Sequence, residues 1–297
     1  MVTPQTESPE IARELGVGAL YLKREDLHPL GSHKGRSIPV MIDLKVAKGA
    51  TDFAISSSGN AALAAARHIK ARNAAGSKLS LLILVGRNIE AGKLKRLQEE
   101  AVGEPRIRIE AEARPLQALF NLIKNDGKTS LRQSNDPDAL VGYRTLAAEI
   151  AATPNLEAVF IGTSSGTTAE ALADYFVEHA GRTGEPFPQV HVVQTAGVSP
   201  IAKAFAQEES EPEASLADAI VDKVAHRALS VENAVRKTAG HGWIASNADI
   251  RRAIELLRDK AGIEATPNGA LSLAGLIKAR ASGRRFAGSV VCVVTGK

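Results

Sequence analysis

Short apolar runs alternate with helix-like segments along nearly the whole chain. Apolar, β-branched runs between turn residues predict strands, and apolar residues at helical spacing predict helices. The predicted strands are 19–23, 52–56, 79–85, 106–110, 158–162, 190–195 and 290–294. The predicted helices are 37–48, 61–71, 91–100, 116–124, 138–151, 169–179, 247–260 and 271–280. This alternation implies right-handed crossovers and mostly parallel, twisted sheets covered by helices on both faces, so we predict an α/β protein.

The composition is that of a globular protein that buries a full core. The chain has 297 residues, 44% of them hydrophobic and 24% charged, which excludes a mainly disordered or collagenous chain. Lys and Arg number 37 against 33 Asp and Glu, a formal net charge of +4. Basic and acidic residues are interspersed, as in 251–260, so the charge predicts no nucleic-acid partner. The length allows one large domain or two ordinary ones.

Cysteine usage and hydropathy predict a cytoplasmic protein without a metal site. Cys292 is the only cysteine, which excludes an intramolecular disulfide and a multi-cysteine zinc site, and it is predicted to be a buried, inert thiol. The N-terminus lacks a signal-peptide pattern, and the longest apolar runs are too short to span a bilayer. The acidic segment 208–213 is predicted to be mobile.

Two loops follow predicted strands and precede predicted helices, where ligands bind in parallel sheets. The loop 56–60 has the sequence Ser-Ser-Ser-Gly-Asn, and the loop 162–168 has two glycines and five hydroxyl residues in seven positions. A glycine allows close approach of the backbone, and a helix N-terminus offers free N–H groups to an anion. Taken alone, the first loop is more typical of an ordinary capped turn. The second predicts a phosphate site, although it lacks the lysine of a Walker loop.

A lysine and a threonine complete the candidate site. Lys34 lies between Gly31 and the predicted helix start near Ser37. The field at a helix N-terminus disfavours its charged form, which suits a Schiff-base lysine, because the amine must lose a proton before it attacks a carbonyl. A solvated surface lysine is the alternative. Thr295 follows the last predicted strand at the same sheet edge.

Taken in order, these motifs resemble the fold-type II pyridoxal-phosphate enzymes, the tryptophan-synthase-β superfamily. The resemblance covers nearly the whole chain. Within the superfamily, Ser-Ser-Gly-Asn-Ala-Ala at 57–62 and Val-Thr-Gly at 294–296 are most similar to threonine synthase; threonine dehydratase is the next most similar. The segments that carry the resemblance are 21–27, 31–34, 57–62, 142–145, 162–168, 193–194, 269–270 and 274–276.

The resemblance implies a role for each matched residue. Lys34 would be the catalytic residue, forming the Schiff base and moving the α-proton. Asn60 would bind the phenolic oxygen of the cofactor, and Thr295 would face its pyridine nitrogen. The implied cofactor-binding residues are Lys34, Asn60, Gly162, Thr163, Ser164, Ser165, Gly166, Thr167 and Thr295. The implied substrate-binding residues are His33, Ser57, Ser58 and Gly59.

Some residues depart from the superfamily pattern. His33 stands where a phenylalanine is usual, and it is either a proton donor or a stacking surface. Gly35 replaces the usual acidic residue, and Thr266 replaces a glutamate. A hydroxyl at Thr295, in place of a carboxylate, leaves the pyridine nitrogen largely unprotonated, which favours elimination or replacement over transamination.

We therefore expect a two-domain lyase of amino-acid metabolism with pyridoxal 5'-phosphate in the interdomain cleft. Each domain should have three layers, αβα, with residues 1–36 and 132–297 in the larger domain and 37–131 in a smaller mobile one. The expected reaction is threonine-synthase-like elimination or replacement at the β or γ carbon of a small amino acid. A serine or threonine dehydratase, a cysteine-synthase-like enzyme, a non-catalytic relative that binds pyridoxal phosphate or an amino acid, and a nucleotide-binding protein are the alternatives. We expect a homodimer with no membrane partner.

Overall fold

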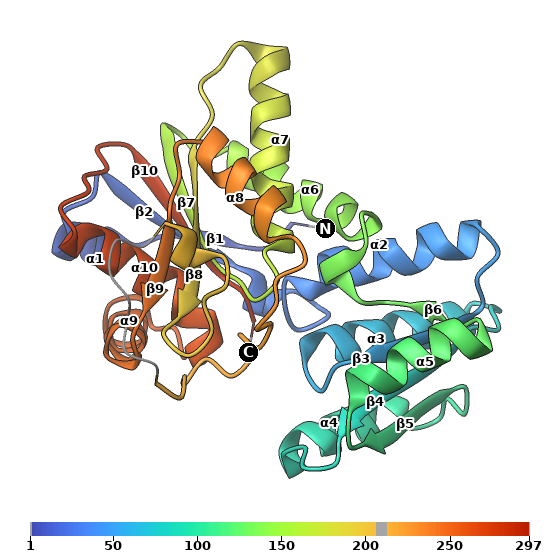
Figure 1. Ribbon diagram of the computed structural model, residues 1–297. Coiled ribbons are helices and arrows are strands. Elements are labelled where there is room, and N and C mark those ends of the chain that lie inside the picture. The colour runs from blue at the N-terminus through green and yellow to red at the C-terminus, as the bar shows by residue number, and fades with distance from the viewer. Residues whose placement is uncertain (1, 206–212, 297) are drawn as a thin grey trace. The chain divides into compact units, whose positions relative to one another are not determined.

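The computed structural model describes residues 2–205 and 213–296 (Figure 1). The chain forms two compact units: unit 1 is Met1–His28 with Tyr143–Lys297, and unit 2 is Pro29–Gly142. Lys34 and its helix fall in unit 2, because that helix, α2 (Lys34–Ala47), packs against α3 (Asn60–Ala74). The sequence instead placed residues 1–36 with the larger domain and 37–131 in a smaller one; that mobile domain stays a prediction.

Unit 1 is built on a six-stranded sheet in the order β1-β2-β10-β7-β8-β9. Only the β1–β2 pair is antiparallel, and the other four pairs are parallel. The strands are β1 (Gln5–Glu7), β2 (Ala19–Arg24), β7 (Leu156–Gly162), β8 (Gln189–Thr195), β9 (Gly242–Ala245) and β10 (Ser289–Val294). The helices are α1 (Pro9–Leu15), α6 (Asp138–Ala151, which runs across the division between the units), α7 (Thr167–Thr183), α8 (Ala228–Lys237), α9 (Asn247–Ala261) and α10 (Pro267–Ala281).

The central strand β10 shows how both faces of this sheet are buried. Val290, Cys292 and Val294 pack in the core formed with α1, α9 and α10. Val291 and Val293 pack in the second core, formed with α6, α7 and α8. Because successive side chains of a strand point to opposite faces, an unbroken apolar run fills both cores.

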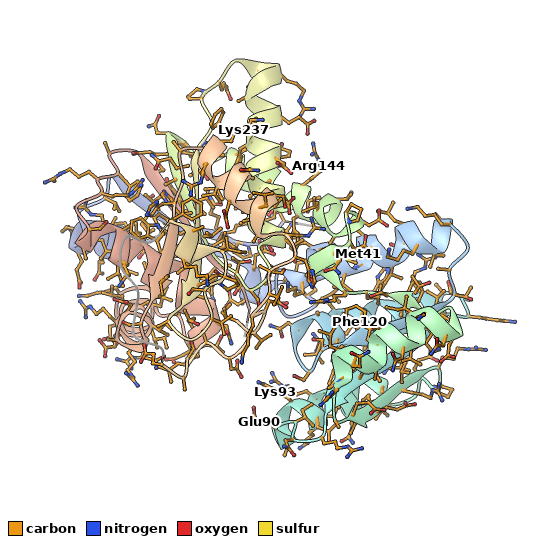
Figure 2. The ribbon with its side chains drawn as sticks, viewed as in Figure 1. Met41, Glu90, Lys93, Phe120, Arg144 and Lys237 are labelled. Atoms are coloured by element: carbon orange, nitrogen blue, oxygen red, sulfur yellow. The ribbon has the colours of Figure 1, made fainter. Side chains whose placement is uncertain are left out.

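Unit 2 has a four-stranded, fully parallel sheet in the order β5-β4-β3-β6. The core on one face includes Met41 of α2, labelled in Figure 2, with side chains of α3 and α4. On the other face Leu119 of α5 is buried, whereas the next residue, Phe120, is 40% exposed. The elements not yet given are β3 (Asp52–Ser56), β4 (Ser80–Gly86), β5 (Ile107–Glu112), β6 (Thr129–Ser130), α4 (Ala91–Ala101) and α5 (Pro115–Asp126).

The α/β prediction is confirmed, with two mostly parallel sheets. Cys292 is buried as predicted, and burial raises the pKa of its thiol far above the usual range. Of the segment predicted to be mobile, residues 208–212 lie outside the described residues. Within the described ranges, no helix combines the length and apolar character needed to cross a membrane.

Candidate active site

Lys34 is the first residue of α2. The Ser32 hydroxyl accepts the Lys34 backbone N–H at 3.2 Å, and the Ser32 carbonyl accepts the Gly35 N–H at 2.9 Å. These bonds start the helix one turn before Ser37, so the predicted helix start was wrong. Lys34 is half-buried, and among the described residues its ammonium has no hydrogen-bond or ion-pair partner. A lysine in this position is suited to bond with a carbonyl compound.

Two buried hydrogen bonds of the Ser37 side chain fix the first turn of α2. The Ser37 hydroxyl accepts from the Gln133 side-chain amide at 2.7 Å and donates to the Ala139 carbonyl at 2.7 Å. Gly142 packs so closely that a Cβ there would lie 2.2 Å from the Arg36 carbonyl oxygen. The start of α2 is therefore fixed against α6 within unit 2.

The loop between β3 and α3 presents an open helix N-terminus. The helix begins at Asn60, and its N-cap, Gly59, provides no side-chain hydrogen bond. The Ser57 hydroxyl accepts the Gly59 N–H at 3.3 Å, and a Cβ on Gly59 would meet no atom within 4 Å. The first N–H groups of a helix have no intrahelical acceptor, so this end suits a carboxylate or another anion.

The loop between β7 and α7 in unit 1 is an almost fully buried cradle. The Thr163 hydroxyl accepts the Gly166 N–H at 2.9 Å, and the Ser165 and Thr167 hydroxyls lie 2.9 Å apart. One hydrogen bond between two hydroxyls leaves one O–H of the pair to donate to a ligand. The N–H groups at the start of α7 add further donors, as a bound phosphate requires.

Ser164 does not offer its hydroxyl to this cradle. Its Oγ donates to the Asp222 carboxylate at 2.9 Å and accepts the N–H groups of Val221 and Asp222 at 3.0 Å. The Gln194 side-chain amide donates to the Ser164 carbonyl at 3.0 Å. Ser164 therefore shapes the loop through its side chain, and only its backbone N–H is left as a donor to a phosphate.

Thr295 lies beside this cradle at the carboxyl end of β10. The pairing of Val293 with Ile161 brings the ends of β10 and β7 together. Thr295 is buried, and its hydroxyl donates to the Asn268 carbonyl at 3.2 Å. Thr266, which stands where the resemblance expects a glutamate, caps α10 by accepting the Gly269 N–H at 3.2 Å.

The structure thus gathers the sequence-predicted residues into two groups. Unit 2 carries His33, Lys34 and the loop 57–60, whereas unit 1 carries the loop 162–167 and Thr295. Sequence reasoning missed the charged residues that contact the unit 1 loop and its helix, Asp222, Glu170 and Arg227. The segment before α8, which supplies Asp222 and Arg227, contains no motif that marks them. Gln194 was visible in the sequence only as part of the resemblance.

These features fit pyridoxal phosphate. A lysine amine at a helix start can hold an aldehyde, and the buried cradle of N–H and hydroxyl donors can hold a phosphate. At Gly166 the backbone φ of +83° and the 2.5 Å approach of an added Cβ to Val231 exclude a side chain. The fold and these loops define the class as a fold-type II pyridoxal-phosphate enzyme.

Comparison with known proteins agrees with this class. The family described as "Pyridoxal-phosphate dependent enzyme" matches residues 1–296, and the chain belongs to that family, whose cofactor is pyridoxal phosphate. It is 31% identical to a threonine synthase of Bacillus sp. (strain ULM1), over 99% of this chain and 82% of that protein. A threonine synthase of Mycobacterium leprae is 30% identical, over 99% and 80%. Maize serine racemase has the same fold, with a TM-score of 0.78 and 19% identity over 99% of this chain and 87% of that structure.

Proposed function

We propose that this protein is a threonine-synthase-like lyase that catalyses elimination or replacement at the β or γ carbon of a small amino acid. The observation that carries the proposal is Lys34 at the start of α2, which has no charged partner within the described part of the chain, in a protein 31% identical to a threonine synthase. Because the chain belongs to a pyridoxal-phosphate-dependent family, we no longer consider nucleotide binding for the loop 162–168.

The residues of unit 2 would bind the substrate and move its proton. Pyridoxal phosphate, when bound, supplies the electron sink for the pair left at the α carbon. Lys34 Nζ would hold the cofactor and afterwards take up the α-proton. The N-terminus of α3, with Ser57, Ser58 and Gly59, would hold the substrate carboxylate, and Asn60 would orient the ring through its phenolic oxygen.

The residues of unit 1 would fix the phosphate and leave the ring nitrogen without a counter-charge. The loop 162–167 would bind the phosphate through N–H groups and the hydroxyl pair of Ser165 and Thr167. Thr295 carries a neutral hydroxyl, so it supplies no negative charge to keep a facing pyridine nitrogen protonated. A weaker electron sink suits loss of a good leaving group, such as phosphate, better than transamination.

The first experiment tests the lysine. Wild-type protein with pyridoxal phosphate should absorb in the visible, and borohydride should fix the cofactor on the peptide that contains Lys34. Lys34→Ala should lose both signals, while Lys48→Ala, an exposed lysine at the end of the same helix, should keep them. A borohydride-fixed adduct that persists in Lys34→Ala would overturn the assignment.

The second experiment separates the candidate reactions. Phosphohomoserine, threonine, serine and O-acetylserine are added in turn, and released phosphate, 2-oxo acid and acetate are measured. Phosphate release from phosphohomoserine alone supports the proposal, whereas 2-oxo acid from threonine or serine identifies a dehydratase. Acetate release from O-acetylserine identifies a cysteine-synthase-like enzyme, and no turnover identifies a binding protein. The homodimer and the cytoplasmic location remain predictions.

A further inference from the structure

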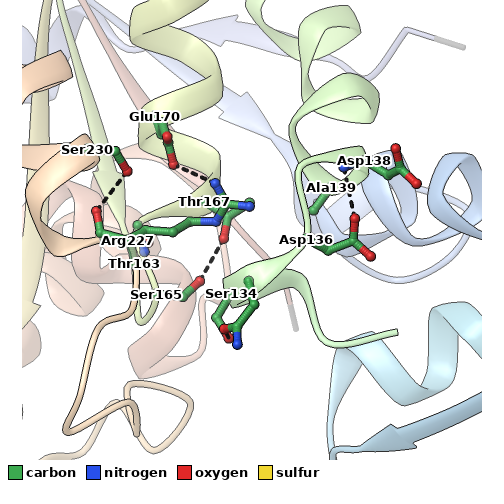
Figure 3. A network of polar contacts seen from close by, with 12 residues as sticks. Ser134, Asp136, Asp138, Ala139, Thr163, Ser165, Thr167, Glu170, Arg227 and Ser230 are labelled. Atoms are coloured by element: carbon green, nitrogen blue, oxygen red, sulfur yellow. Dashed lines mark hydrogen bonds and ion pairs between the residues drawn. The ribbon is translucent and has the colours of Figure 1, made fainter. Parts of the chain in front are cut away.

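The phosphate loop contains no cation, yet charged side chains contact it and its helix. Glu170 belongs to the first turn of α7, where its N–H donates to the Gly166 carbonyl at 3.0 Å. Arg227, just before α8, donates to the Glu170 carboxylate at 3.0 Å. Figure 3 shows the Arg227 side chain reaching the N-terminal turn of α7, where Thr167 and Glu170 lie. The Asp222 carboxylate contacts Ser164 in the loop itself.

The Arg227–Glu170 pair is weakly screened by solvent. The two side chains are 11% and 10% exposed, so the charge of either one alone would act strongly on a nearby ion. Asp174, one turn further along α7, feels this charge: partial burial and the Glu170 carboxylate both raise the pKa of Asp174.

A phosphate ester carries a charge of about −1.5 to −2 at neutral pH. The N-terminus of α7 offsets about half a charge. An uncompensated Glu170 at the first turn of the same helix would repel the phosphate, and Asp222 adds a second carboxylate. A cation beside Glu170 would therefore favour binding of a dianion in the loop.

We propose that Arg227 is an electrostatic positioning residue of the phosphate site: it neutralises Glu170, so that the N-terminus of α7 accepts the cofactor phosphate. This inference rests on the proposed function. A purely structural ion pair, which only ties α8 to α7, is the competing explanation. The two explanations predict different effects of Glu170→Gln on the affinity for pyridoxal phosphate. The electrostatic role predicts unchanged or tighter binding, whereas a purely structural pair predicts the same loss as in Arg227→Gln.

The test measures dissociation constants for pyridoxal phosphate and for pyridoxal, which lacks the phosphate, by visible absorbance. Arg227→Gln should weaken binding of pyridoxal phosphate on the order of tenfold or more. Glu170→Gln should bind pyridoxal phosphate as tightly as wild type or more tightly. The double variant should return to within about threefold of wild type, because the two charges disappear together. Pyridoxal affinity should stay unchanged throughout.

Matched variants keep the outcome decisive if Arg227→Gln folds poorly. Arg227→Lys keeps the charge and should bind pyridoxal phosphate nearly as well as wild type. Arg182→Gln breaks the exposed pair with Glu178 near the other end of α7 and should change nothing. Equal losses in Arg227→Gln and Glu170→Gln, or a parallel loss for pyridoxal, overturn the role of Arg227. Wild-type protein that binds neither compound overturns the proposed function itself.

Discussion

His191 on β8 is completely buried, and its burial disfavours the charged form of the ring. Its ring stacks on Phe160 with the centroids 4.4 Å apart, and its Nδ1 accepts from the Trp243 indole N–H at 3.2 Å. Because Nδ1 is an acceptor, the neutral ring carries its proton on Nε2, which is buried and has no partner within the described part of the chain. Burial, with the charge of Arg284 and then of His241, lowers the pKa of His191 well below its usual value.

This lowered pKa makes stability depend on pH. Below about pH 6.5 the unfolded chain takes up a proton at His191 and the folded chain does not, so the free energy of unfolding falls as pH falls. The expected loss from this group approaches about 1.4 kcal/mol per pH unit. Urea unfolding between about pH 8 and pH 5 should show a smaller pH slope in His191→Asn. Some slope should remain, because burial also lowers the pKa of His241. Identical slopes in both proteins would contradict the argument.

Gly166 gives a second prediction for a single residue. Its φ of +83° disfavours an L side chain, and an added Cβ would lie 2.5 Å from Val231 and 2.8 Å from Ile201. Gly166→Ala should lose about 2 kcal/mol or more of unfolding free energy and weaken pyridoxal phosphate binding. Gly184→Ala, at the other end of α7, is the control: its φ is +75°, but nothing lies within 4 Å of the added Cβ. An equal effect at both positions would show that crowding at the loop is not the cause.

At this scale the sequence offers candidate residues but not the contacts of their side chains. Lys34, Asn60 and the loop 162–167 are candidates because of their residue types and the family resemblance, and their roles stay predictions. The hydrogen bond from the Ser164 hydroxyl to Asp222 was not predictable, since Asp222 lies 58 residues away in an irregular segment. The pairing of Glu170 with Arg227 is hidden for the same reason.

Among the elements, α9 has a complete capping box. The Ser246 hydroxyl accepts the Asp249 N–H at 3.2 Å, and the Asp249 carboxylate accepts the Ser246 N–H at 2.8 Å. Ser246→Ala should lower the free energy of unfolding by about 1 kcal/mol, since it leaves the first turn of α9 without its cap. Ser77→Ala, at a serine with no side-chain hydrogen bond among the residues described, should change it by less than about 0.5 kcal/mol. Urea titration measures both, and equal values would argue against the capping effect.

Elements with strong periodicity were predictable and short ones were not. The helix predicted at 138–151 matches α6 residue for residue, and the seven predicted strands each correspond to an observed strand. The missed strands β1, β6 and β9 have two to four residues and depend on pairing with neighbours. The missed helices α1 and α8 are short as well. Local pattern carries too little information in such elements, because their formation is decided by tertiary contacts.

For the whole molecule, the alternation of strands and helices predicts the α/β fold class but not how the strands divide into two sheets or their order in each sheet. The last strand, β10, inserts between β2 and β7, whereas β3 to β6 form a sheet of their own. Strand order depends on which side chains pack together after crossovers, and a single sequence does not show this. The sequence likewise did not show that Lys34 folds with the unit that carries the loop 57–60.

Each unit carries part of the proposed cofactor-binding residues, so binding should stabilise both. At a free concentration one hundred times the dissociation constant, a ligand specific for the folded state adds about 2.7 kcal/mol. Pyridoxal phosphate should raise the thermal midpoint and should slow amide exchange at the starts of both α2 and α7. In Lys34→Ala, pyridoxal phosphate should raise the thermal midpoint by a smaller amount, since this variant retains the phosphate loop but not the amine. Protection confined to one unit would contradict the assignment of the residues in the other.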